Sequence, residues 1–120
     1  CIKANLSFWK KIWCASPEKF NAALDVWNLH YLAKIPYGDL SQGQKQRVSL
    51  ARLSLKKASL WLLDEPLSNL DQESCEIFKS VLKTHLNAGG MALVATHQGL
   101  ECTHKITLKA CANFDFREVA

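Results

Sequence analysis

Two short apolar runs, each without a polar interruption, stand out in the second half of the chain. Leu60–Leu63 ends at the adjacent carboxylates Asp64 and Glu65 and then at Pro66, and Met91–Ala95 is the second run. Apolar runs of this length that lack alternation are typical of parallel strands buried on both faces. We therefore expect a strand buried on both faces at the first run, ended by Pro66 because proline has no backbone donor, and a short apolar strand at Met91–Ala95.

A helical stripe of apolar residues separates the two runs. Asp71 can cap a helix that continues to about Ala88, and Gly89-Gly90 ends it. The stripe consists of Ile77, Phe78, Val81, Leu82 and Leu86. Strand, helix and strand in this order predict a right-handed crossover with parallel strands. The sequence also indicates a further edge strand at Lys105–Leu108.

The segment before the first strand predicts a third helix. Ser41 is a suitable N-cap, and Gln44 three residues later completes a capping box. The apolar stripe of this helix consists of Val48, Leu50, Ala51, Leu53 and Leu55. A capped helix start beside Gly43 offers free backbone donors and a positive dipole end, which suit a phosphate, although most capped starts bind only water.

The first third of the chain predicts two further helices. The first carries apolar residues at helical spacing: Leu6, Trp9, Ile12 and Trp13. The second starts at Ser16-Pro17, with serine as cap and proline at the first helical position. Its apolar face is expected to carry Phe20, Ala23, Leu24, Trp27 and Tyr31. We interpret the tryptophans as packing residues rather than as a ligand site.

Composition and charge narrow the class without deciding it. The 120 residues, 48% hydrophobic and 22% charged, fit one globular domain or part of one. A net charge of +4 would tolerate an anionic partner, but the basic residues are scattered along the sequence, which favours a solvated surface. No apolar run approaches the roughly 18 residues of a membrane span, and the N-terminus lacks a signal-peptide pattern.

The first residue of the chain and its cysteines lead to two further expectations. The chain opens at Cys1 and its only methionine is Met91, so we expect the natural start to be missing. Five cysteines, an odd number without a C-x-x-C pair, indicate free thiols in a reducing compartment. Cys102 and His104 are neighbours without a second pair, which is too little to predict a metal site.

The polar residues that follow the two strands are the candidate site. Asp64 and Glu65 lie just past the first strand, and His97 lies just past the second. Open α/β sheets bind ligands at the carboxyl ends of their parallel strands, so these three side chains are expected at one edge. The pleat is expected to send Asp64 and Glu65 to different sides, which allows them different tasks.

Four motifs in order and at the right spacing resemble the ABC-type ATPases. Leu40–Val48 resembles the signature motif, Leu60–Pro66 the Walker B strand, Ser68–Asp71 the D-loop, and Ala95–His97 the segment with the switch histidine. The signature departs from its commonest form at Gln42, a position that varies within the family.

The resemblance implies an α/β fold with an incomplete P-loop NTPase-like parallel sheet, preceded by the end of an α-helical subdomain. Residues 1–57 would be the end of the helical subdomain, including the signature motif and its helix. Residues 58–120 would be the C-terminal part of the RecA-like ATPase core.

The resemblance also implies a role for each site residue, with ATP and Mg²⁺ as cofactors. Asp64 would hold Mg²⁺ through water, Glu65 would act as general base on the attacking water, and His97 would bond the γ-phosphate. Asp71 would act across a dimer interface. In the alternative interpretation Asp64-Glu65-Pro66 is a solvated strand end, His97 a satisfied histidine and Asp71 a helix cap.

Ser41, Gly43 and Gln44 would by the same resemblance contact the ATP of a partner subunit. A phosphate-cradling G-x-x-x-x-G-K-S/T loop is absent from the sequence. Gly38 and Gly43 have the glycine spacing, but the wrong residues follow and no strand precedes them. The resemblance implies that the full-length protein hydrolyses ATP. Because the loop is missing, we expect these 120 residues alone to be inactive.

Details of three motifs are similar to the haem-exporter ATP-binding subunits of cytochrome c maturation. They are Arg47–Leu53, Leu60–Pro66, and Gly89–Met91 followed by Thr96–Gln98. This resemblance implies a homodimer beneath integral membrane subunits, at the cytoplasmic face of the inner membrane, in a haem pathway, with no nucleic-acid partner. Two alternatives stay open: the ATPase of another ABC transporter or a soluble ABC ATPase, and a non-enzymatic interaction module.

Overall fold

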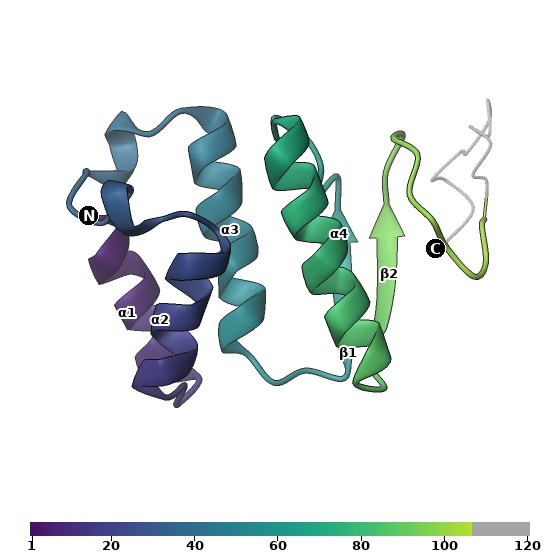
Figure 1. The fold of residues 1–120 in the computed structure, drawn as a ribbon, viewed down its shortest axis with the longest axis horizontal. Coiled ribbons are helices and arrows are strands. Elements are labelled where there is room, and N and C mark those ends of the chain that lie inside the picture. The colour runs from purple at the N-terminus through teal and green to yellow at the C-terminus, as the bar shows by residue number, and fades with distance from the viewer. Residues whose placement is uncertain (107–120) are drawn as a thin grey trace, which may run out of the picture.

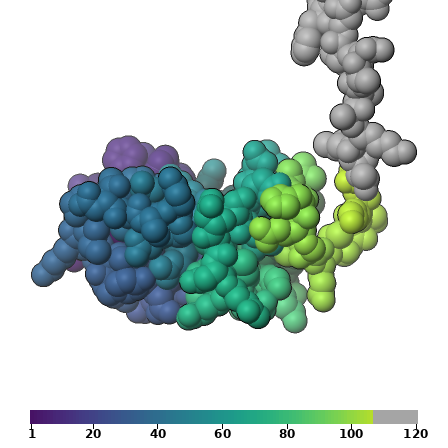
Figure 2. All heavy atoms as spheres, turned by 90° about the horizontal axis from the view of Figure 1, so that it is seen from above, coloured from purple at the N-terminus to yellow at the C-terminus, as the bar shows by residue number. Residues whose placement is uncertain are grey.

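The computed structural model describes residues 1–106, which form a helical bundle beside a small sheet covered by one helix (Figure 1). The elements in chain order are α1 (Ile2–Ile12), α2 (Pro17–Val26), the 3₁₀ turns η1 (His30–Leu32) and η2 (Tyr37–Asp39), α3 (Gln42–Leu55), β1 (Leu60–Asp64), α4 (Gln72–Asn87) and β2 (Met91–Ala95). Seen from above, the bundle and the sheet with α4 are neighbouring masses (Figure 2). The expected edge strand at Lys105–Leu108 extends beyond the described residues, and Lys105 and Ile106 are in no strand.

The helical bundle is built as the apolar stripes indicate. Ile2 and Leu6 of α1 are buried, and Trp27 is completely buried at the end of α2. Ser16 caps α2 by accepting a hydrogen bond from the backbone N–H of Lys19 at 3.3 Å, as predicted. Burying a large side chain of this kind stabilises a fold by about 1.5–3 kcal/mol, so these residues hold the three helices together.

The second helix is shorter than predicted. It ends at Val26, and Tyr31 lies in η1 with 64% of its surface exposed, so the expectation that Tyr31 belongs to the apolar face is wrong. The cause is a left-handed residue, Asn28, with φ +50°. The N–H of Leu29 bonds the carbonyl of Leu24 at 2.9 Å, and the N–H of Asn28 bonds that of Asp25 at 3.1 Å. This pair of bonds closes a helix end, and asparagine tolerates the left-handed conformation better than most residues.

Helix α3 agrees with its sequence pattern from the first residue. Ser41 Oγ accepts a hydrogen bond from the N–H of Gln44 at 3.2 Å, and Gln44 Oε1 accepts one from the N–H of Ser41 at 2.9 Å. The predicted capping box is therefore confirmed. Four of the five stripe residues are buried, namely Val48, Leu50, Ala51 and Leu55, and Leu53 is half-buried.

The two strands are parallel, as predicted, with Leu60 opposite Met91 and Asp64 opposite Ala95. The burial of β1 is not as predicted, because only one face of the sheet is covered in the described part of the chain. Trp61 is buried, whereas Leu62 and Leu93 are 70% and 63% exposed. Successive strand residues face opposite sides, and α4 lies against one side alone (Figure 1).

A stacked pair of rings joins α4 to β1. The His85 and Trp61 rings are 3.8 Å apart between centroids and tilted by only 3°, and the Nε2–H of His85 donates to the Met91 carbonyl at 3.0 Å. Gly89 ends α4 with φ +83°, in agreement with the prediction. Gly90 follows with the imidazole of His85 against its Cα, so a β-carbon there would overlap the ring.

Among the described residues, no helix combines the length and the apolar character that crossing a membrane requires.

Replacing Gly90 with alanine is expected to displace His85 from Trp61. The loss of the stack and of the hydrogen bond to Met91 should lower the free energy of unfolding by about 1–3 kcal/mol. Urea unfolding followed by tryptophan fluorescence measures this. Gly38→Ala is the matched control, because a β-carbon on Gly38 meets nothing within 4 Å. Equal stabilities of the two variants would contradict the role given to the stack.

Candidate functional site

The candidate site begins where the pairing of β1 and β2 continues one residue past the strand. The N–H of Glu65 donates to the carbonyl of Ala95 at 2.8 Å. Glu65 then turns into the left-handed region with φ +42°. A left-handed conformation in a residue other than glycine is uncommon and costs about 1–3 kcal/mol. The turn redirects the Glu65 side chain away from the strand and toward the segment after β2.

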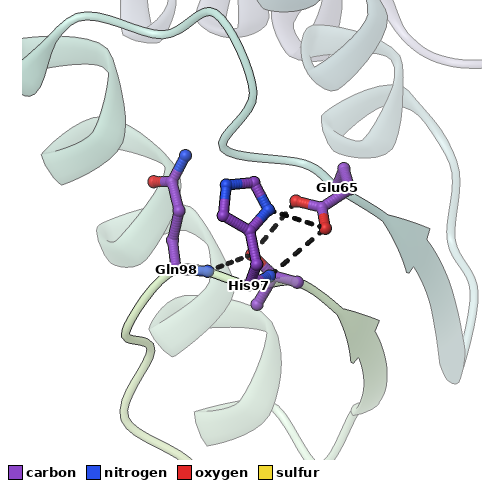
Figure 3. Close-up of polar contacts among 4 residues, drawn as sticks. Glu65, His97 and Gln98 are labelled. Carbon is purple, nitrogen blue, oxygen red and sulfur yellow. Dashed lines mark hydrogen bonds and ion pairs between the residues drawn. The ribbon is translucent and has the colours of Figure 1, made fainter. Parts of the chain in front are cut away.

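The carboxylate of Glu65 is held by the residues that follow β2 (Figure 3). Glu65 Oε1 accepts from the backbone N–H of His97 at 3.2 Å and lies 3.0 Å from His97 Nδ1. Glu65 Oε2 accepts from the Thr96 hydroxyl at 3.4 Å, and Thr96 Oγ1 accepts from the N–H of Gln98 at 3.1 Å. Two chain segments 32 residues apart thus meet as a carboxylate–imidazole pair.

These hydrogen bonds set the charge of Glu65. The bond from the His97 side chain, the charge of that ring, and the bonds from the His97 backbone and the Thr96 hydroxyl lower the pKa of the carboxyl below its ordinary value of 4.5. Glu65 is therefore ionised at neutral pH. An ionised carboxylate beside an imidazole can accept a proton from water, provided that the reacting water lies within hydrogen-bond reach.

Asp64 lies apart from this pair. Its side chain is exposed and lines a groove of about 610 Å³ between α1, α3 and the uncovered face of β1. A lone exposed carboxylate suits Mg²⁺, which takes oxygen ligands and keeps most of its waters. Asp64 therefore faces the groove, whereas the left-handed backbone of Glu65 turns its side chain toward Thr96 and His97.

The start of α3 rests on the loop that follows Glu65. A β-carbon on Gly43 would lie 2.5 Å from the backbone carbonyl oxygen of Asn69, so only glycine permits this approach. The side-chain amide of Gln46 donates to the carbonyl of Pro66 at 3.0 Å. Asn69 itself is left-handed, with φ +61°. The segment predicted as signature and the segment predicted as D-loop are therefore in direct contact within one chain.

The hydrogen bonds of the remaining predicted residues stay local in the described structure. The exposed Ser41 and the half-buried Gln44 bond each other in the capping box. Asp71 Oδ1 accepts from the N–H of Ser74 at 2.8 Å and caps α4, as its sequence position indicates. The bonds from Ser74 lower the pKa of the Asp71 carboxyl, with a smaller contribution from the charge of Arg47.

Sequence reasoning missed three residues that build the site. Thr96, between the strand and His97, could have been found as a hydroxyl residue that bonds the backbone two positions on. Gln46 and Asn69 carry no such signal, because their partners are remote in sequence.

A parallel strand–helix–strand unit with two adjacent carboxylates at the end of its first strand, beside a capped helix start, is typical of one edge of an α/β domain that binds a ligand there. Comparison with known protein families identifies the family. The family model described as "ABC transporter" matches residues 2–68, more than half of the chain. The chain belongs to the ABC transporter family.

Two curated relatives carry the name "Cytochrome c biogenesis ATP-binding export protein CcmA". The chain is 44% identical to the protein from Paracoccus denitrificans over 96 residues, which are 80% of this chain and 45% of that protein. It is 39% identical to the protein from Chelativorans over 111 residues, 91% of this chain and 55% of that protein. The chain thus spans about half the length of these relatives.

Solved structures support the fold. The chain is similar to the RNase-L Inhibitor, with a TM-score of 0.63 and 26% identity over 78% of this chain and 18% of that one. A "Model of ribosome-bound archaeal Pelota and ABCE1" contains a similar chain, with a TM-score of 0.65 and 25% identity over 78% of this chain and 15% of that one. The fold is therefore that of an incomplete P-loop ATPase core.

The hydrogen bond from His97 should lower the pKa of Glu65 by an amount that can be measured. The carboxyl carbon of Glu65, followed by NMR, should titrate with a midpoint below 4.5. His97→Ala should return it toward 4.5, because the largest cause of the shift is gone. His104→Ala, a change at an exposed histidine, is the control and should leave it unchanged.

The lowered pKa of Glu65 also determines how the stability of the fold changes with pH. A carboxyl whose pKa is lowered by folding stabilises the fold above its unfolded pKa, and this contribution is lost as the pH falls below about 4.5. A Glu65 midpoint at or above 4.5 in the unsubstituted chain would contradict the geometry.

Proposed function

We propose that this chain is part of the ATP-binding and ATP-hydrolysing subunit of an ABC transporter in cytochrome c biogenesis. The observation that carries the proposal is the Glu65–His97 pair at the carboxyl ends of two parallel strands, in a chain of the ABC transporter family. The relatives named as cytochrome c biogenesis ATP-binding export proteins support the pathway. The haem substrate rests on the resemblance of the sequence motifs alone.

The three acidic and imidazole groups divide the chemistry. Glu65, ionised and aligned by His97, takes a proton from the attacking water; general bases of this kind contribute typically about 10²–10⁴-fold. When the His97 ring leaves Glu65, it donates a hydrogen bond to the γ-phosphate of ATP. Asp64, which lines the groove, would hold Mg²⁺ through water. Mg²⁺, when bound, supplies neutralisation of the phosphate charge.

The start of α3 serves a phosphate from a second subunit. Ser41, Gly43 and Gln44 lie at the positive end of a 14-residue helix, where unbonded N–H groups and the helix dipole favour an anion. The contact of Gly43 with Asn69 ties this helix start to the loop that leads to Asp71. We propose that ATP binding at one site is thereby transmitted to the loop of the other, with Asp71 at the dimer interface.

The uncovered sheet face is consistent with a domain that is larger than the described chain. Leu60, Leu62, Met91 and Leu93 are all exposed on β1 and β2. Parallel sheets occur almost only with both faces covered. We propose that residues 1–57 end the helical subdomain, that residues 58–120 belong to the ATPase core, and that the rest of the domain covers this face.

The proposed partners follow from the pathway of the relatives. We propose a homodimer bound to integral membrane subunits, so that the chain is peripheral at the cytoplasmic face of the inner membrane. Its cofactors are ATP and Mg²⁺.

Replacing Glu65 with glutamine tests the proposed hydrolysis. The experiment uses a chimaera in which this chain replaces the matching part of the Paracoccus denitrificans relative. Glu65→Gln keeps shape and hydrogen bonding but removes the base, so hydrolysis should fall by about 10²-fold or more while ATP binding persists. Steady-state phosphate release and nucleotide titration measure the two quantities. Glu76→Gln on α4 is the control, and a Glu65→Gln chimaera with full turnover would refute the assignment.

The isolated chain should behave differently. We propose that residues 1–120 alone neither bind ATP tightly nor hydrolyse it, since the loop with lysine and glycines that holds most of the phosphate contacts is not in this sequence. Calorimetric titration of the purified chain with Mg-ATP tests this, and micromolar affinity would contradict it.

A further inference from the structure

Six basic residues that are dispersed in the sequence gather at one end of the helical bundle. We call this region the basic end; it consists of Lys10, Lys11, Lys19, Arg52, Lys56 and Lys57. The last turn of α1, the first turn of α2 and the end of α3 meet there, at the lower end of the bundle in Figure 1. Lys19, Lys56 and Lys57 line one cavity of about 390 Å³.

The charge of the basic end is not balanced within the described chain. None of its six cations is within ion-pair distance of a carboxylate among residues 1–106. Glu18 is the one acidic residue that these helix turns contribute; its carboxylate bonds Ser16 and interacts only weakly with the charge of Lys10. The net charge of the whole chain is only +4, so the basic end holds essentially all of the excess positive charge.

Helix dipoles explain part of this arrangement and not the rest. Lys10, Lys11 and Arg52 lie in the last turns of α1 and α3, where a cation is favourable. Lys19 lies in the first turn of α2, where the dipole disfavours it. Lys57 follows α3 with an exposed side chain. Lys10, Arg52 and Lys56 lie over aromatic rings of the fold. The exposed Lys11, Lys19 and Lys57 have no ion pair or ring contact among the described residues, and their like charge points to an external anion.

Exposed apolar side chains lie beside these cations. Phe8 and Ile12 are 57% and 52% exposed and lie one turn apart on α1, with Lys11 between them on the same face. Lysine stems and a neighbouring apolar pair suit the boundary between lipid headgroups and acyl chains. The apolar side chains of Phe8 and Ile12 are unfavourable in water, and the charged backbone of a nucleic acid would not bury them.

The tryptophans of the region argue against nucleic acid in a second way. Trp9 and Trp13 stack on each other with centroids 4.8 Å apart. Arg52 lies 5.3 Å from the centre of the Trp9 ring, and Lys56 lies 5.9 Å from that of Trp13. Because single-stranded nucleic acids bind by stacking bases on free aromatic faces, these occupied rings are unsuited to them.

We propose that the basic end, together with Phe8 and Ile12, is a docking surface for a membrane leaflet rich in anionic lipid. Charge complementarity with the headgroups attracts the six cations, and the two apolar side chains enter the interface. This contact is additional to the proposed attachment through membrane subunits and does not depend on the proposed ATPase activity.

Vesicle binding tests the proposal on the 120-residue chain itself. The chain should sediment with vesicles of phosphatidylcholine and phosphatidylglycerol in equal parts and not with vesicles of phosphatidylcholine alone. Binding should be largely lost at about 1 M salt, where the screening length is about 3 Å. Equal binding to both vesicles would overturn the proposal.

Matched variants locate the surface. The double variant Lys11→Gln, Lys57→Gln removes two exposed cations and should lower the partition coefficient by about thirtyfold. Lys34→Gln with Lys83→Gln removes the same charge elsewhere on the exposed surface and should leave most of the binding intact. Ile12→Ser should weaken binding, whereas Leu86→Ser, at a similarly exposed leucine of α4, should not.

Circular dichroism confirms that each variant is folded before it is compared. Equal losses in the two lysine double variants would overturn the proposal, because binding would then reflect net charge alone. A single-stranded oligonucleotide that displaces the chain from anionic vesicles, and whose binding is lost in Lys11→Gln, Lys57→Gln, would assign the basic end to nucleic acid instead.

Discussion

The parallel pairing of β1 with β2 is the constraint on which the site depends. It continues past the strands in the bond from the Glu65 N–H to the Ala95 carbonyl, and this bond fixes the backbone from which the Glu65 side chain departs. The left-handed turn at Glu65 then brings its carboxylate to His97 and Thr96. The strain of that turn persists because backbone pairing on one side and side-chain hydrogen bonds on the other both require it.

Close backbone approaches connect this site to the helical bundle. Gly43 admits the carbonyl of Asn69, and Gln46 bonds the carbonyl of Pro66, so the start of α3 cannot move without the loop after Glu65. At the other end of the sheet, the stack of His85 on Trp61 holds α4 to β1. Helix α4 is therefore fixed at both ends: Asp71 caps its start, and the ring stack holds its last turn.

The two ends of the bundle present different surfaces, and each is proposed to bind a different partner. The start of α3, at the end where the strands finish, presents a capped helix with free backbone donors beside the carboxylate site. The basic end, some 14 residues along the same helix, presents cations and exposed apolar side chains. One helix thus separates the surface proposed for nucleotide phosphate from the surface proposed for lipid phosphate. The exposed Leu62 and Leu93 form a third surface, apolar and parallel-stranded, that suits the packing of further polypeptide.

The sequence by itself determined the elements whose causes are local. The capping box of Ser41 and Gln44, the caps Ser16 and Asp71, the Gly89 helix end and the order strand, helix, strand all depend on residues within a few positions of one another. Motif order also determined the family, which the comparisons confirm. The end of α2 was missed, although Asn28 carried a local signal for it.

Only the tertiary structure decided what depends on remote neighbours. The exposure of Leu62 could not be inferred from its apolar run, because burial requires a covering layer that the strand does not encode. The hydrogen bonds of Glu65 to Thr96 and His97, and the approach of Gly43 to Asn69, join segments more than 25 residues apart. Basic residues that are scattered along the sequence became one charged surface because three helix ends meet in space. Charge and burial are properties of position in the fold, whereas capping and periodicity are properties of the chain.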